Sequence, residues 1–195
     1  MKFQKNKITG VILAGGKNSR FGAEKALAKI NGIRIIDRTI TVMRDVFSEN
    51  IIIANNEDMY KGLCLNVYPD KVKGRGPLMG IYTALCHTST DIFVTACDMP
   101  LINAGIMKKI VDSLDAYDAV IPRYEGKSHF LHAAYSLRCI NSFKKRLDVE
   151  SLKLKEVTKD LNCNIIEKFE FEDSHLSPFF NMNTRDDFIL AKNYL

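Results

Sequence analysis

The 195-residue sequence lacks several features that would assign it to a special class. No apolar run approaches the roughly 20 residues that a membrane-spanning helix needs. The basic segment at residues 1–7 is not followed by a long apolar core, which argues against a secretory signal. Glycine and proline, at 11 and 5 residues, are too few for a collagen-like or low-complexity chain. We therefore expect a globular protein that folds as one domain over residues 1–195.

Cysteine is present in a pattern that argues against disulfides and thiolate zinc sites. The number of cysteines is odd and includes no C-x-x-C pair; they are Cys64, Cys86, Cys97, Cys139 and Cys163. Most of them fall in apolar segments, where a free cysteine behaves as a small core side chain. We expect a reducing, cytoplasmic setting.

The formal net charge of +5 and the isoelectric point of about 8.9 suit anionic ligands. Nucleotides, phosphorylated metabolites and nucleic acid would all satisfy such an excess. The chain lacks runs of lysine and arginine interleaved with aromatic residues, which disfavours nucleic acid. We expect a small anionic substrate, with no nucleic acid and no membrane as partner.

Short apolar runs alternate with stretches of helical periodicity along the chain. The runs predict strands at 9–13, 50–54, 63–68, 91–97, 119–121 (ended by Pro122) and, more exposed, 164–171. Helices are predicted at 34–47, 78–86, 103–114, 139–147, 151–161 and after a capping box of Thr184 and Asp187. This alternation predicts a three-layer α/β/α fold with a mostly parallel central sheet, a Rossmann-like nucleotide-binding architecture.

The strongest functional signal is the segment 13–25, which follows the first predicted strand. It contains three glycines and three cationic side chains. Glycine lets the backbone approach an anion closely, and successive N–H groups can then surround phosphate oxygens. Arg20 and Lys25 would neutralise the phosphate charge. The segment matches neither G-x-x-x-x-G-K-[ST] nor G-x-G-x-x-G, so we predict a phosphate-binding loop of another type.

Three further positions carry polar side chains where such a fold binds its ligand. Asp98 ends a central apolar strand, and a carboxylate together with phosphate oxygens is a usual way to hold Mg²⁺. Asp70 precedes a glycine-spaced loop and could accept hydrogen bonds from a base or a sugar. Asn181 and Asn183 precede the last helix, where simple capping is the alternative role. His129 and His132 lack a third ligand at suitable spacing, so they are predicted to be core residues.

Taken together, these segments resemble the signature of the molybdenum cofactor guanylyltransferases, within the glycosyltransferase-A-like nucleotidyltransferase superfamily. The matching pieces run in order through 8–25, Asp70, 76–80, 97–100 and 181–184. The resemblance implies an enzyme that transfers GMP from GTP to the terminal phosphate of molybdenum-molybdopterin, releasing pyrophosphate. Implied partners are other molybdenum cofactor biosynthesis proteins and acceptor molybdoenzymes.

The resemblance also implies roles for single residues. GTP would be bound by Leu13, Ala14, Gly15, Gly16, Lys25, Asn55 or Asn56, Asp70 and Asp98. Arg20, Lys25 and Asp98 would be catalytic, with Asp98 as the Mg²⁺ ligand, and Asn181 and Asn183 would lie on the pterin side. Phe21, Glu24 and Phe130 depart from the family pattern, which usually has Met, Asp and Pro there.

Two alternatives stay open at this point. The chain could be a nucleotidyltransferase of the cytidylyl or sugar-phosphate type, although the Gly15-Gly16 doublet favours guanine over cytosine by the family resemblance. It could also be a nucleotide-binding regulatory protein without turnover. The cationic loop and Asp98 together disfavour this last alternative. A phosphate acceptor is already anionic, so its reaction needs mainly positioning and charge neutralisation, which these residues can supply.

Overall fold

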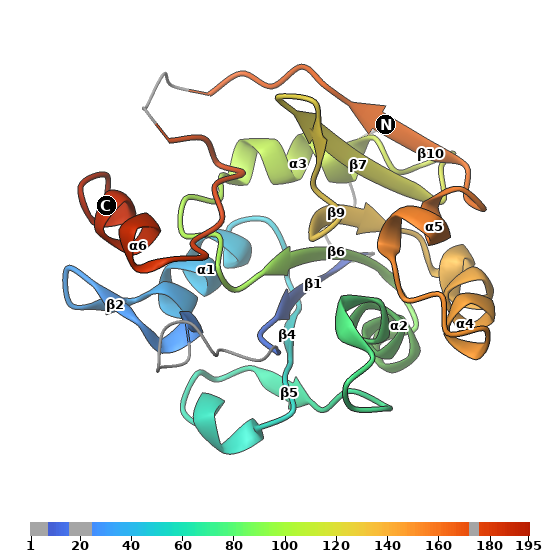
Figure 1. Cartoon of the computed structure of the whole chain (residues 1–195), viewed down its shortest axis with the longest axis horizontal. Helices are drawn as coiled ribbons and strands as arrows, with labels where there is room; N and C mark the ends of the chain where they lie inside the picture. Colours follow the sequence, from blue (N-terminus) through green and yellow to red (C-terminus); the bar gives the residue numbers. More distant parts are fainter. Residues whose placement is uncertain (1–7, 16–24, 172–175) are drawn as a thin grey trace.

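The computed structural model describes residues 8–15, 25–171 and 176–195. Within this part of the chain, a central sheet has helices on both faces, so the predicted three-layer fold is confirmed (Figure 1). The order of its strands is β10-β7-β9-β6-β1-β4-β5, and β8 pairs with β7 at one end. No helix among the described residues is long and apolar enough to cross a bilayer.

The sheet is mostly parallel, and one inner strand runs the other way. Its strands are β1 (Ile8–Leu13), β4 (Asn50–Ile53), β5 (Asn66–Tyr68), β6 (Asp91–Ala96), β7 (Ala119–Tyr124), β8 (Lys127–Ser128), β9 (His132–Tyr135) and β10 (Cys163–Ile166). The pairs β5–β4, β4–β1, β1–β6 and β7–β10 are parallel, whereas β9 is antiparallel to both β6 and β7. The carboxyl ends of β4, β1 and β6 therefore meet at one edge, where Leu13 aligns with Ile53 and with Ala96.

The helices divide between the two faces of the sheet (Figure 1). They are α1 (Ile35–Arg44), α2 (Gly76–Thr88), α3 (Ala104–Asp112), α4 (Ile140–Asp148), α5 (Leu154–Thr158) and α6 (Arg185–Lys192), with 3-10 turns η1 (Lys25–Leu27), η2 (Glu57–Tyr60) and η3 (Leu137–Cys139). Side chains along a strand point alternately to opposite faces. Ile12 accordingly packs in the core under α1 and α3, and Val11 packs in the core under α2 and α4.

A small third core lies at the edge of the molecule. The hairpin formed by β2 (Lys29–Ile30) and β3 (Ile33–Arg34) packs beside α6, where Ile30, Met182 and Ala191 are buried together (Figure 1). The capping box predicted for α6 is present, because Thr184 and Asp187 each accept a backbone hydrogen bond from the other. This arrangement brings the carboxyl-terminal segment alongside the start of the chain's first helix.

Four sequence predictions of element boundaries are wrong. Pro122 does not end its strand: β7 continues to Tyr124, because the pairing with β9 stops at Val120 and the missing N–H interrupts no bond there. The strand predicted at 164–171 ends at Ile166, since Phe169 and Phe171 leave the sheet to pack against other rings. The predicted strand at 63–68 and helix at 151–161 are each shorter, as β5 and α5.

Candidate functional site

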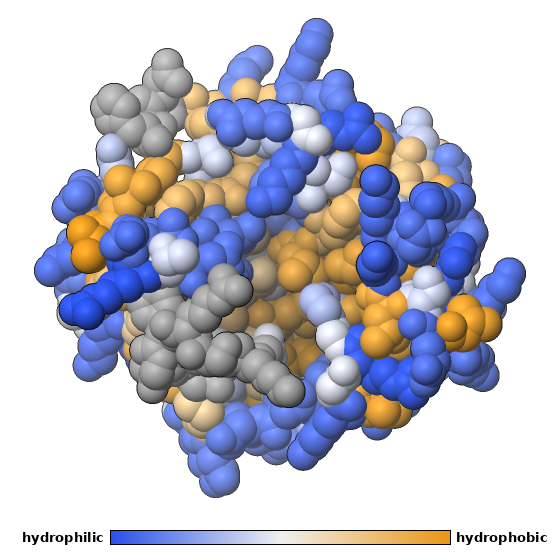
Figure 2. Space-filling model, in the orientation of Figure 1, coloured by the Kyte–Doolittle hydropathy of each residue, from blue (hydrophilic) through white to orange (hydrophobic). Residues whose placement is uncertain are grey.

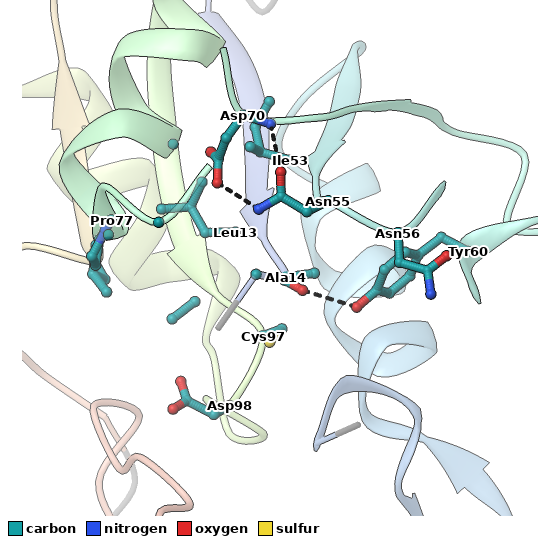
Figure 3. A pocket seen from close by; sticks show the side chains of 16 residues that line it. Leu13, Ala14, Ile53, Asn55, Asn56, Tyr60, Asp70, Pro77, Cys97 and Asp98 are labelled. Carbon is teal, nitrogen blue, oxygen red and sulfur yellow. Dashed lines mark hydrogen bonds between the residues drawn. The ribbon is translucent and has the colours of Figure 1, made fainter. Parts of the chain in front are cut away.

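A pocket of about 640 Å³ opens at the shared carboxyl edge of β1, β4 and β6. Figure 2 shows a hollow with an apolar interior near the middle of this face. Predicted site residues from four separate segments line the pocket; they are Leu13, Ala14, Gly15, Asn55, Asp70 and Asp98. Figure 3 shows five of these residues labelled around the opening. From sequence, their proximity is expected because ligands bind beyond the carboxyl ends of the strands in a parallel sheet.

The end of β1 is held by its neighbours on both sides. Ala14 N–H donates to the carbonyl of Ile53 at 3.0 Å, and the Leu13 carbonyl accepts from Cys97 N–H at 3.1 Å. The buried Tyr60 donates its hydroxyl to the Ala14 carbonyl at 3.0 Å (Figure 3). The last residues of the strand therefore enter the pocket on a fixed backbone.

Asn55 and Asp70 form a pair closed by two hydrogen bonds. Asn55 Nδ2 donates to Asp70 Oδ2 at 2.8 Å, and Asp70 N–H donates to Asn55 Oδ1 at 3.2 Å (Figure 3). Burial raises the pKa of the Asp70 carboxyl above its usual value, and the Asn55 amide acts in the opposite direction. Both asparagines line the pocket, but Asn55 is the one that orients Asp70.

A glycine-spaced loop forms the wall opposite β4. Gly74 and Gly76 both have positive φ, at +82° and +67°, a conformation that favours glycine. Pro77 then occupies the first turn of α2, and Gly80 follows one turn later. A Cβ at Gly80 would lie 3.0 Å from Leu13 Cδ2, so this glycine sets the distance between α2 and the end of β1.

Asp98 lies at the other side of the opening, two residues after the end of β6. Its carboxylate is drawn at the edge of the pocket in Figure 3. Met182 N–H donates to the Asp98 carbonyl at 2.9 Å, which ties the segment before α6 to this position. Among the described residues, no group of three or more His, Cys, Asp or Glu could hold a metal ion. A single carboxylate at the edge of this pocket fits Mg²⁺, which usually takes one or two carboxylates and completes its shell with water and substrate oxygens.

Several predicted site residues are not tested by this geometry. Gly16, Arg20 and the side chain of Lys25 lie outside the described residues, although Lys25 begins η1. Asn181 and Asn183 do not line the pocket, but Met182 between them contacts Asp98 through its backbone. Asn183 N–H donates to the Asp187 carboxylate at 2.8 Å, so its backbone contributes to capping α6.

His132 is a core residue, as predicted, whereas His129 is only half-buried beside it. His132 is fully buried, its Nδ1 lies 3.2 Å from Thr95 Oγ1, and burial lowers its pKa to about 3. Burial likewise lowers the pKa of His129 to about 4. The ring of Phe179 stacks on His129 with centroids 4.7 Å apart and meets His132 edge-on at 5.7 Å.

Sequence reasoning missed other residues that line the pocket, chiefly Tyr60 and Leu131. Tyr60 belongs to a short 3-10 turn after β4, and nothing in its local pattern distinguishes it from a core tyrosine. Leu131 precedes β9, a strand that was not predicted. For Tyr60, position in the segment that follows a predicted strand is the one signal that could have selected it.

Comparisons with known proteins agree with this geometry. A family model described as a MobA-like NTP transferase domain matches residues 10–161. A Pelotomaculum thermopropionicum protein named "Probable molybdenum cofactor guanylyltransferase" is 35% identical over 188 residues, covering 94% of this chain and 91% of that protein. The crystal structure of molybdopterin-guanine dinucleotide biosynthesis protein A from Archaeoglobus fulgidus has a TM-score of 0.82 at 24% identity, covering 95% and 97% of the two chains.

The same fold also occurs in a protein named for a different nucleotide. The structure of 4-diphosphocytidyl-2C-methyl-D-erythritol synthase from Anaerococcus prevotii has a TM-score of 0.74 at 13% identity, with 97% of this chain and 96% of that chain covered. Likeness at this level of identity shows the fold alone. The architecture is therefore shared by proteins named for guanine and for cytosine nucleotides.

Proposed function

The chain belongs to the family of MobA-like NTP transferases, as its sequence resemblance predicted, and we propose that it transfers GMP from GTP to the terminal phosphate of molybdenum-molybdopterin. The products are molybdopterin guanine dinucleotide and pyrophosphate. The observation that carries this proposal is the convergence of the β1 end, the Asn55–Asp70 pair and Asp98 on one pocket. The name of the 35%-identical relative supports the choice of nucleotide and acceptor.

The nucleotide would occupy the pocket between the β1 end and the start of α2. Its base would lie near Leu13, Asn55 and Asp70. The triphosphate would extend along the predicted phosphate-binding segment 13–25 toward Asp98. A guanine ring carries N–H groups on its Watson–Crick edge that can donate hydrogen bonds to a carboxylate. This fits the prediction that Asp70 accepts hydrogen bonds from the base. Gly15 and Gly16 would leave the backbone close to the phosphates.

The protein would contribute to catalysis mainly through electrostatic interactions. The attacking group is a phosphate that is already anionic at neutral pH, so no strong general base is required. The barrier comes from bringing two anions together, and positioned cations lower it. We assign Arg20 and Lys25 to the triphosphate and to the leaving pyrophosphate, and Asp98 to the metal.

A divalent metal is the ordinary cofactor of such transfers, and we propose Mg²⁺ held by Asp98 and the phosphate oxygens. When bound there, Mg²⁺ would neutralise the charge that develops on those oxygens. Asp98 would determine the position of the metal ion, because its backbone follows β6 on one side and is hydrogen-bonded to Met182 on the other. Asn181 and Asn183, on the segment next to Asp98, are assigned to the pterin side of the acceptor.

The remaining parts of the proposal concern context. We propose that residues 1–195 act as one nucleotidyltransferase domain in the cytoplasm. The product would pass to other molybdenum cofactor biosynthesis proteins and to acceptor molybdoenzymes. Neither nucleic acid nor a membrane has a part in this function.

The test is pyrophosphate release by the purified protein with Mg²⁺ and molybdenum-molybdopterin, offered GTP, CTP or ATP in parallel. The expected result is release with GTP at least about tenfold faster than with the others, a preference of the size that one well-placed hydrogen bond gives. Mass spectrometry of the product then identifies the dinucleotide. Equal rates with all three nucleotides, or transfer only to a sugar phosphate, would reject the proposal.

A cytidylyltransferase is the second candidate, because the fold is shared with a protein named for a diphosphocytidyl product. Cytosine is smaller than guanine, so this alternative predicts that CTP binds at least as tightly as GTP in the same pocket. The three-nucleotide comparison decides between the two without a further experiment.

A further inference from the structure

Tyr60 contacts the backbone that carries the predicted nucleotide site, although sequence analysis assigned it no role. It ends η2, lies beside the pocket and is only 2% exposed. Its hydroxyl donates to the carbonyl of Ala14 at 3.0 Å, across 46 positions of sequence. Figure 3 shows Tyr60 on one side of Ala14, with Cys97 and Asp98 on the other.

The hydrogen bonds of the β1 end follow the alternation of an extended chain. The N–H of Ala14 and its carbonyl both face the β4 side, the first bonded to Ile53 and the second to Tyr60. The carbonyl of Leu13, one residue earlier, faces the β6 side and accepts from Cys97 N–H. In an extended strand, neighbouring peptide groups point to opposite sides in this way.

The next N–H in the chain belongs to Gly15, and its direction follows from peptide geometry. Because a trans peptide is planar, the Gly15 N–H points opposite to the Ala14 carbonyl with which it shares that peptide. It therefore points away from Tyr60 and toward the side of Cys97 and Asp98. Gly15 is exposed and lines the pocket, and no described residue accepts a hydrogen bond from its N–H. A ligand in the pocket can supply that acceptor.

Nothing in the side chain of residue 15 would hold this peptide in place. Glycine has no Cβ, and a Cβ built on Gly15 would meet nothing within 4 Å, so side-chain packing at this position does not restrain the backbone. Among the described residues, the hydrogen bond from Tyr60 is the contact that holds the Ala14 carbonyl toward the β4 side. Without it, the carbonyl could turn toward the ligand and present an acceptor where a donor is needed.

We propose that Tyr60 is a positioning residue for nucleotide binding, which holds the Ala14–Gly15 peptide so that Gly15 N–H faces the pocket. The ligand class is an anionic or carbonyl-bearing group of a nucleoside triphosphate. This inference rests on the proposed function for the identity of that ligand. It does not require that the nucleotide be transferred to any particular acceptor.

The test compares Tyr60→Phe with a matched control, Tyr135→Phe. Tyr135 is also fully buried, and its hydroxyl donates to a backbone carbonyl, that of Phe130, at 2.8 Å. Each substitution removes one buried hydroxyl and keeps the ring. A purely structural role for both would lower the melting temperatures of the two variants alike and leave nucleotide binding unchanged in both.

Binding of GTP with Mg²⁺ is measured by titration calorimetry, without an acceptor, alongside thermal unfolding. We expect Tyr60→Phe to weaken GTP binding about tenfold, the effect of losing one oriented hydrogen bond, and Tyr135→Phe to change it less than twofold. In turnover, the loss from Tyr60→Phe should enter KM, with kcat within about threefold of wild type. Equal GTP affinity in wild type and Tyr60→Phe, at whatever stability, overturns the proposal.

The binding assay separates this inference from the proposed function. Wild type that binds a nucleoside triphosphate but transfers nothing to molybdenum-molybdopterin refutes the function and still leaves Tyr60 to be judged by the variant's affinity. Wild type that binds CTP or ATP more tightly than GTP is judged in the same way with that nucleotide. Wild type that binds none of the three refutes both.

Discussion

The backbone N–H of Met182 donates a hydrogen bond to the backbone carbonyl of Asp98 at 2.9 Å. This bond joins the segment that leads into α6 to the turn after β6. The same segment is anchored by Phe179, which is 3% exposed and contacts the rings of Tyr124, His129, His132 and Phe169. The position of the Asp98 carboxylate is therefore determined in part by residues near the end of the chain.

The first prediction concerns the charge of Asp98. Asp98→Asn keeps the size of the side chain and removes the carboxylate that we assign to Mg²⁺. We expect kcat to fall by about 100-fold or more, a loss typical of removing one group that stabilises transition-state charge. Circular dichroism and the melting temperature should stay close to those of wild type. Activity within threefold of wild type at saturating Mg²⁺ would show that the metal is held elsewhere.

The second prediction concerns the anchor at Phe179. Phe179→Ala should destabilise the protein by about 3–5 kcal/mol, the usual loss for a buried phenylalanine. Because Phe179 and Met182 lie on one segment, we also expect kcat to fall about tenfold or more, measured well below the melting temperature. Urea unfolding and steady-state kinetics give the two values.

The control for this variant is Phe143→Ala. Phe143 is fully buried and meets Tyr135 edge-on at 5.5 Å, in the core on the other face of the sheet. It should lose a similar free energy of unfolding with little change in kcat. Equal losses of kcat in the two variants would mean that general destabilisation, and not the position of Asp98, limits turnover.

The central strands could be predicted from sequence because their burial is a local property. β1 and β6 are buried on both faces and mostly apolar, as strands between two helical layers usually are. β9 could not be predicted: His132–Tyr135 is short, and it is a strand because it pairs with β6 and β7. The end of β7 was wrongly predicted at Pro122 for the same reason, because whether a proline ends a strand depends on where the pairing with β9 stops.

The candidate site likewise contains residues that the sequence predicts and contacts that only the folded chain creates. Asp70 and Asp98 line the pocket, and sequence selected both because each follows a predicted strand, at the ligand-binding edge of such a sheet. The pairing of Asn55 with Asp70 could not be predicted, because its two hydrogen bonds depend on how the loops after β4 and β5 approach each other. Tyr60 acts through the backbone of Ala14, and no sequence pattern reports that contact.

The third prediction concerns the space between α2 and β1. Gly80→Ala places a methyl group 3.0 Å from Leu13 Cδ2 and 3.6 Å from Asp70 Oδ1. Alanine favours a helix interior by about 1 kcal/mol over glycine, which offsets the crowding, so we expect little change in stability. The displaced Leu13 should narrow the pocket and raise the KM for GTP about threefold to tenfold. A KM equal to that of wild type would show that the base lies away from this wall.

The last prediction is a pH dependence of stability that arises from His132. Burial, and then the charge of His129, lower the pKa of His132 from 6.5 to about 3 in the folded state. Between those two values the unfolded chain binds the proton and the folded chain does not. Stability is therefore lost as the pH falls below 6.5, by about 1.4 kcal/mol for each pH unit from this one residue.

Among the residues that the structure describes, the groups in contact with His132 add no compensating negative charge. They are Thr95, the rings of Phe93 and Phe179, and His129, whose pKa is itself lowered to about 4 by burial and then by Lys127. His132→Gln keeps a neutral polar group that can reach Thr95 and removes the titration. Carboxylates and His129 titrate in both proteins, so their effects largely cancel when the two are compared.

Urea unfolding of wild type and His132→Gln at pH 7, 6 and 5 measures the difference directly. At pH 7 the variant should be the less stable protein, because the imidazole fits its cavity better than the amide. As the pH falls to 5, wild type should lose more free energy than the variant, by about 1.4 kcal/mol for each pH unit below 6.5. Two parallel curves would mean that the buried imidazole gains its proton without cost, and would require an acceptor for it in the core that the described contacts do not supply.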